Sequence, residues 1–265
     1  MTTIPAYVGE QRVTRVRVLF SEWTKLRSLP STVWSLLTTL VLVVGFGVVY
    51  SMVRVTRPPA DPSAFDGAGV SLAGVQLAQL AIGVLGVLLM TGEYATGSIR
   101  VSLAAVPKRL DLLWGKAVTF GFTTFAVCVP AVFAAFIVGQ KILAAEHLDV
   151  AIGAPGVVRA ILGSALFLTV VGLLGLGLGG VLRNTAGGIA ALFGLLFAPQ
   201  IIVGFLPESV SDQVYKYVPA AAGQAIMFVK PDVASLSPWT GFGMFCLYTA
   251  VVLALAAWQL RRRDA

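Results

Sequence analysis

Long apolar runs separated by short polar segments follow one another along nearly the whole chain. Six of these runs are long enough to cross about 30 Å of hydrocarbon as a helix. A helix satisfies its own backbone hydrogen bonds within the segment, so each run predicts a membrane-spanning helix. The predicted spans are 33–53, 70–91, 115–138, 157–182, 187–206 and 239–260. The expected fold is therefore all-α: a polytopic membrane protein whose six-helix transmembrane domain occupies residues 32–260.

The composition agrees with this pattern. Apolar residues make up 57% of the 265 residues and charged residues only 12%, which is far from the balance of a soluble domain. Cys128 and Cys246 lie in apolar runs, where a thiol behaves as a small buried hydrophobe. The one histidine, His147, lies in a polar connection, where a solvated side chain is more common than a metal ligand. We therefore expect no metal site.

The segment before the first span, within residues 1–31, has the 3.6-residue periodicity of an amphipathic helix. Its apolar stripe comprises Val13, Val16, Leu19, Phe20, Trp23 and Leu26. The residues expected to point away from the stripe are Thr14, Arg17, Ser21, Glu22 and Lys25. A basic polar face opposite an indole suits an interfacial helix in the headgroup region. We expect Arg17, Trp23 and Lys25 to anchor this helix on anionic membrane lipid.

Basic residues divide unequally between the two sides of the predicted topology. Thirteen of the 19 lysines and arginines fall on the side of the two termini, and six fall on the other. The positive-inside bias therefore predicts that residues 1–31 and the tail 261–265 are cytoplasmic. The basic balance follows from topology, so we expect no nucleic acid partner. On the opposite side, the connection at 207–238 is too apolar for a free loop. We expect it to fold back onto the membrane surface, and a partly re-entrant helix is the alternative.

Motifs for nucleotide binding or catalysis are absent from the sequence. It contains no GxxxxGK[ST], HExxH or GxSxG pattern, so we expect neither an enzyme nor a cofactor in this chain. The middle of each predicted span lacks the acidic residue that proton-coupled carriers use, which disfavours secondary transport. Gln76 and Gln79 are weak candidates for a substrate cavity, because uncharged amides often serve only to join helices.

The connection between the second and third spans reads "GEYATGSIRVSLAAVPKRLDLLWGKAV" and contains the isolated acid Glu93. A short helix capped by Thr96 or Ser98 and ended by Pro107 would form a rigid peg on the cytoplasmic side. Its apolar residues exceed what a solvated loop exposes, which favours a partner groove. Packing on the membrane surface is the second interpretation.

This connection resembles the cytoplasmic connection of type-2 ABC transporter permeases. In that pattern a Glu precedes Gly-Thr or Gly-Ser, a short helix, Pro with basic residues, and a Lys that opens the next span. Those places are held here by Glu93, Gly97, Ser98, Pro107, Lys108, Arg109 and Lys116. The entry segment "SEWTKLRS", the six spans and the outer "YVPAAAGQA" extend the resemblance to actinobacterial permeases over nearly the whole chain. Tyr94 stands where many relatives carry a basic residue, so an ion pair at that position cannot be carried over.

The resemblance implies an export permease, because the importer-type cytoplasmic motif is missing. It implies a dimer of two such permeases in the cytoplasmic membrane of a bacterium, assembled with two separate ATP-binding subunits. ATP and Mg would then be held, and ATP hydrolysed, by those partners. The coupling helix would contact the ATPase through Glu93, Tyr94, Gly97, Ser98, Ile99, Val101 and Leu103. We expect Glu93 to contact an arginine of the entry helix or the backbone of the peg. The alternative is a self-contained secondary carrier or channel that needs no ATPase.

Overall fold

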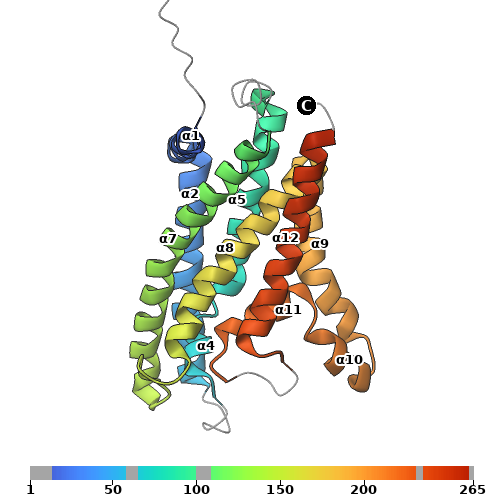
Figure 1. The fold of residues 1–265 in the computed structure, drawn as a ribbon. Coiled ribbons are helices and arrows are strands. Elements are labelled where there is room, and N and C mark those ends of the chain that lie inside the picture. Colours follow the sequence, from blue (N-terminus) through green and yellow to red (C-terminus); the bar gives the residue numbers. More distant parts are fainter. Residues whose placement is uncertain (1–13, 58–64, 100–108, 231–234, 263–265) are drawn as a thin grey trace, which may run out of the picture.

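The computed structural model describes residues 14–57, 65–99, 109–230 and 235–262. Helices run roughly side by side through one bundle, and the described part of the chain contains no strand (Figure 1). Six helical segments are long and apolar enough to span a membrane: Pro30–Thr56, Val75–Ala95, Leu110–Glu146, Val157–Leu182, Thr185–Gly204 and Pro238–Arg262. The chain is therefore an all-α polytopic membrane protein, as the sequence predicts.

The first helix, α1 (Arg15–Ser28), precedes the first span and lies across one end of the bundle, where Figure 1 views it nearly along its axis. The chain turns at Leu29, which is extended, and Pro30 opens α2 (Pro30–Val41), where a missing N–H costs nothing. The span continues through a π-helical stretch, η1 (Leu42–Phe46), into α3 (Gly47–Thr56). We call the end that carries α1 and the C-terminus the α1 end.

The second predicted span, 70–91, differs from the structure at both ends. A five-residue helix, α4 (Gly67–Ser71), and a turn come first, and α5 then runs over Val75–Ala95. The turn allows Gly74 to lie directly against the backbone of η1, where a Cβ would collide with the Val43 carbonyl oxygen. Hydropathy alone does not detect such a break. At its far end α5 extends beyond residue 91, so Glu93 lies in its last turn.

The third helix, α7 (Arg109–Leu143), is longer than the predicted 115–138 and continues into the short η3 (Ala144–Glu146). Lys116 consequently lies inside this helix. The coupling helix expected before Pro107 lies mostly within residues 100–108, outside the described residues.

The centre of the bundle is α8 (Val157–Leu182), which packs against α5, α7, α9 (Thr185–Gly204) and α12 (Pro238–Arg262). Glycines bring α5 and α8 into backbone contact, as small residues do in lipid. A Cβ on Gly175 would collide with the Gly83 carbonyl oxygen, and one on Gly179 would lie 2.8 Å from the Val87 carbonyl oxygen. Gly175 and Gly179 form a GxxxG pair, a pattern that allows such close packing of helices.

The connection between α9 and α12 forms α10 (Glu208–Tyr215), α11 (Pro219–Gln224) and the short η4 (Ala225–Met227). Both α11 and η4 are buried against α8 and α12, so they do not form a free loop. Gly223 provides the space, since a Cβ there would lie 2.7 Å from the Phe245 ring. The placement of this segment on the membrane surface, or as a partly re-entrant helix, stays a prediction. We call this opposite end of the bundle the α4 end.

Candidate functional site

The inner face of α1 carries a buried carboxylate. Thr14 caps the helix, because its hydroxyl oxygen accepts the Arg17 backbone N–H at 3.4 Å. One turn apart, Val18, Glu22 and Leu26 lie on the face that packs against the bundle, and Glu22 is only 1% exposed. The outer face exposes Val16, Phe20 and Trp23. The prediction that Glu22 points to the polar side is therefore wrong: the helix buries an acid between two apolar residues.

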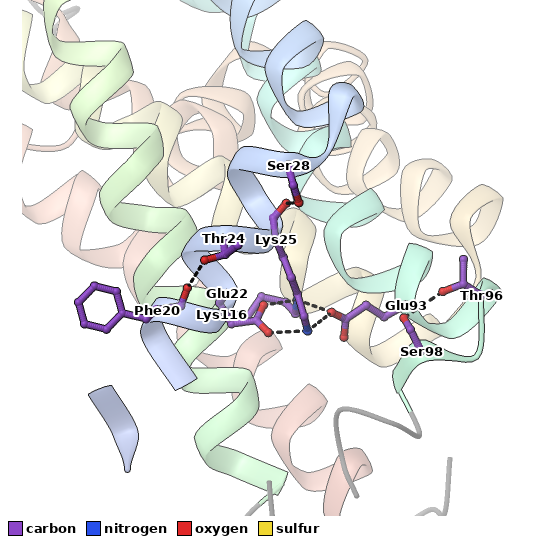
Figure 2. A network of polar contacts seen from close by, with 9 residues as sticks. All are labelled: Phe20, Glu22, Thr24, Lys25, Ser28, Glu93, Thr96, Ser98 and Lys116. Atoms are coloured by element: carbon purple, nitrogen blue, oxygen red, sulfur yellow. Dashed lines mark hydrogen bonds and ion pairs between the residues drawn. The ribbon is translucent and has the colours of Figure 1, made fainter. Parts of the chain in front are cut away.

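Glu22 belongs to a cluster of four charged side chains that joins three helices (Figure 2). The Lys116 ammonium of α7 lies 2.6 Å from Glu22 Oε2 and 2.9 Å from Glu93 Oε1 of α5. The Lys25 ammonium of α1 lies 2.8 Å from Glu22 Oε1 and 3.0 Å from the same Glu93 oxygen. Each carboxylate thus contacts both ammonium groups. We call this set, Glu22, Lys25, Glu93 and Lys116, the ion cluster.

The ion cluster balances two negative charges with two positive ones in a largely dry place. The exposed fractions of the side chains are 2% for Glu22, 6% for Lys116 and 12% for Glu93, whereas Lys25 retains 38%. Buried ion pairs add little net stability, but removing one partner leaves an uncompensated charge. The cluster therefore specifies how α1, α5 and α7 meet more than it stabilises the fold.

The pKa of Lys25 depends on its burial and on the two neighbouring carboxylates. Burial by itself lowers this pKa, but the hydrogen bonds and negative charges of Glu22 and Glu93 outweigh burial and raise the pKa above its ordinary 10.5. Lys25 is therefore protonated throughout the physiological range.

Directly after Glu93 the chain leaves α5 through a defined turn. The Thr96 hydroxyl donates to the Gly92 carbonyl oxygen at 2.9 Å and shares a hydrogen bond with the Ser98 hydroxyl at 3.0 Å. Gly97 has a φ of 70°, the left-handed region in which only glycine is unstrained. The turn thus begins three residues after the ion cluster and sets the direction in which the chain leaves the bundle.

The residues predicted to couple to an ATPase are not all alike in this structure. Tyr94 is half-buried, and the Arg183 guanidinium lies 5.1 Å from its ring centre. Arg183 also donates to the Gln259 carbonyl oxygen at 3.2 Å, so the aromatic ring links the end of α5 to α8 and α12. Ser98 is exposed, as is Gly97, whereas Ile99 is 2% exposed. Val101 and Leu103 lie outside the described residues.

The three residues predicted to anchor α1 also divide. Arg17 and Trp23 are exposed on the outer face of the helix, which fits contact with a membrane interface. Lys25 instead turns inward to the ion cluster. The prediction that Glu93 contacts the entry helix agrees with its pairing to Lys25, but its partners are lysines rather than an arginine or the peg backbone.

The two amides predicted as cavity residues lie at the other end of α5. Gln79 is 1% exposed and donates to the Gln76 carbonyl oxygen at 2.9 Å, so it joins turns within α5. Gln76 accepts from the Gln224 amide of α11 at 3.0 Å and also lines a cavity at the α4 end. Gln76 therefore both joins two helices and lines a cavity, the two roles that the sequence leaves open, whereas the hydrogen bonds described for Gln79 lie within α5.

Two members of the ion cluster, Glu22 and Lys116, are not identified as site residues by the sequence pattern. Glu22 is the only acid between residues 14 and 28, and Lys116 is the only cation between residues 110 and 140 of the long apolar helix α7. Isolated charges of opposite sign at one membrane face are a usable signal, because each needs a partner when it is buried. That pairing argument selects Glu22, Glu93 and Lys116 together.

Beside the ion cluster lies a pocket of about 410 Å³ that is lined by Leu26, Leu85 and Leu89 as well as by the charged groups. Within the ranges described, no three His, Cys, Asp or Glu side chains come together as metal ligands would.

A search with protein-family models finds no match to this chain, and a search of curated proteins finds none either.

Proposed function

We propose that this chain is the membrane subunit of an ATP-driven exporter, in which two copies form the translocation path and two separate ATP-binding subunits supply the energy. The observation that carries this proposal is the ion cluster. It joins the entry helix α1 to the end of α5, three residues before the turn that opens the segment resembling a coupling helix. The permeases that the sequence resembles have, in this order, a basic entry helix, a Glu at the end of the second span and a short helix after it.

The ion cluster suits the transfer of a displacement. A partner that shifts the segment after Gly97 pulls on the end of α5, where Glu93 holds Lys25 of α1 and Lys116 of α7 at about 3 Å. The three helices must then move together, because separation would leave buried charges without partners. An external ATPase could in this way tilt α1, α5 and α7 as one unit.

The proposed location is the cytoplasmic membrane of a bacterium, with both termini in the cytoplasm. Support comes from the uneven division of basic residues and from α1, which lies across the bundle with Val16, Phe20 and Trp23 exposed. Such a face suits the headgroup region of the inner leaflet. The α1 end is then the cytoplasmic end, where an ATPase could dock.

The test is purification of the tagged chain from its native membrane, followed by mass determination and measurement of ATP hydrolysis. We expect a complex with two copies of this chain and two of an ATPase. Ser98→Glu adds a carboxylate at the proposed docking surface and should reduce the bound ATPase about ten-fold. Thr24→Glu, an exposed position on α1 at the same end, is the matched control and should retain the ATPase. Transport in liposomes by the chain alone, without nucleotide, would establish the carrier alternative instead.

A further inference from the structure

A second cavity, of about 560 Å³, opens at the α4 end, far from the ion cluster. Its walls come from η1 and α3, from the segment around α4, and from the end of η4. Most of the lining is apolar or aromatic, and it contains few polar groups. The lining residues are Phe46, Tyr50, Arg54, Phe65, Asp66, Gly69, Val70, Leu72, Ala73, Gln76, Met227 and Phe228. The volume falls within the range of about 300–1,000 Å³ usual for small-molecule pockets.

The cation in this cavity, Arg54, lacks an acidic partner among the described residues. Its Nη2 donates to the Tyr50 hydroxyl oxygen at 2.8 Å, and the guanidinium lies 5.1 Å from the Tyr50 ring centre. Its Nε is buried and makes no hydrogen bond to the described residues. Leaving donors of a half-buried guanidinium unpaired costs desolvation free energy, and an anion that accepts from them would recover it.

The one carboxylate in the lining, Asp66, is already used. Its Oδ1 accepts the Gly69 N–H at 2.9 Å, and its Oδ2 accepts the N–H groups of Val229 and Lys230 at 3.0 and 3.3 Å. These bonds hold the chain after η4 against α4. Asp66 thus builds the cavity wall formed by the neighbouring Met227 and Phe228, and its oxygens are directed at backbone donors rather than at Arg54.

We propose that this cavity binds a single-chain amphiphile with a phosphate headgroup. The phosphate lies on the free edge of Arg54, where a guanidinium forms charge-assisted, often bidentate hydrogen bonds. The hydrocarbon chain lies along Phe46, Phe65 and Phe228. This inference is independent of the exporter proposal, because it concerns binding to the isolated chain and requires neither an ATPase nor transport.

The experiment is a titration of the purified chain, in a neutral detergent, with oleoyl lysophosphatidic acid, followed by native mass spectrometry to count bound molecules. We expect one molecule to bind first. Arg54→Gln should weaken this binding about ten-fold or more, as loss of a charge-assisted bond does. Arg57→Gln removes an exposed cation three residues later, directly after the end of α3, and should leave the binding unchanged. Ala73→Phe should block the same site by filling its apolar part while Arg54 stays in place.

Three outcomes would overturn the proposal. The first is equal binding by the Arg54 and Arg57 variants, which would show that the amphiphile only coats the hydrophobic belt. The second is equal binding of monoolein, which has the same chain without the phosphate. The third is displacement of the amphiphile by millimolar inorganic phosphate alone, which would identify a phosphate site with no use for a chain. Arg54→Lys keeps the charge and, together with a thermal unfolding measurement, separates loss of binding from loss of fold.

Discussion

The two ends of the bundle hold their helices together in different ways. At the α1 end, side chains pair with side chains, and the ion cluster joins α1, α5 and α7 through four contacts of 2.6–3.0 Å. At the α4 end, the charged side chains that join separate segments bind backbone: Asp66 accepts N–H groups of residues 229 and 230, and Arg159 donates to the carbonyl oxygens of Ile226 and Phe228 at 3.1 and 3.0 Å. The first arrangement orients whole helices, whereas the second holds a short irregular segment.

The two ends differ in how far one charged side chain depends on another. The ion cluster requires all four charges at once, because each carboxylate contacts both ammonium groups and a missing charge leaves the others imbalanced. The bonds of Asp66 and Arg159 are made to neutral partners, so each acts alone. Substitutions at the α1 end should therefore disturb the relation between helices, and those at the α4 end should disturb one segment.

The largest expected effect is that of Glu22→Gln. It leaves Lys25 and Lys116 to share the single charge of Glu93, and an uncompensated buried charge costs about 3–5 kcal/mol. The free energy of unfolding, measured by denaturant titration in detergent, should fall by roughly that amount. Arg27→Gln, which removes an exposed charge from the same helix, is the control. Equal stability of the two variants would refute the view that the ion cluster acts as a unit.

A double variant sharpens this result. Replacing Glu22 and Lys116 together by methionine removes one buried pair and leaves Lys25 with Glu93. Because an apolar replacement of a buried pair is often neutral, this variant should be more stable than Glu22→Gln alone. A double variant that is less stable than either single one would mean that the charges stabilise the fold directly.

A smaller and more local effect is expected for Asp66→Ala. Three backbone N–H groups lose their acceptor, and the cost should be about 1–3 kcal/mol. Hydrogen exchange should accelerate at the amides of Val229 and Lys230 while α1 is unaffected. Asp212→Ala, at an exposed acid of the same end, should leave both amides unchanged. Faster exchange throughout the protein would show that the α4 end is coupled to the rest of the bundle.

The smallest expected effect is the dependence of stability on alkaline pH. The pKa of Lys25 is higher in the folded chain than the 10.5 of a free lysine, so folding favours its protonated form. Its contribution is fully present below pH 10.5 and is lost as the pH rises through the folded pKa. Unfolding curves of the wild type and Lys25→Gln should therefore converge above that range. Curves that remain parallel would assign no role to the Lys25 charge.

The sequence predicts the spans well because a membrane-crossing helix needs about twenty apolar residues and little else. It predicts their ends less well, since ends depend on contacts between distant segments. Residues 72–74 leave the helix because Gly74 meets the Val43 backbone, and α5 extends to Ala95 as its last turn is held by the ion cluster. A hydropathy average contains neither contact.

The sequence likewise identifies only part of the candidate site, because the rest depends on contacts between distant segments. Glu93 stands out as a lone acid between apolar runs, whereas Glu22 is hidden by the basic residues around it in α1. Helical periodicity assigns Glu22 to the polar face. In the structure Glu22 instead lies on the buried face, where its Oε2 is 2.6 Å from the Lys116 ammonium. The apolar composition of the connection 207–238 excludes a free loop, but it does not predict that α11 is accommodated beside Phe245 through Gly223.

The sequence separation of the contacts also sets an order in time for synthesis from the N-terminus. The ion cluster is complete once Lys116 has been made, so α1, α5 and α7 can meet before α8 exists. The bonds of Asp66 to Val229 and Lys230 bridge more than 160 residues, with separations of 163 and 164. Since chains generally fold from the N-terminus as they emerge, one end of this protein can close early, and the other stays open until nearly the whole polypeptide has left the ribosome.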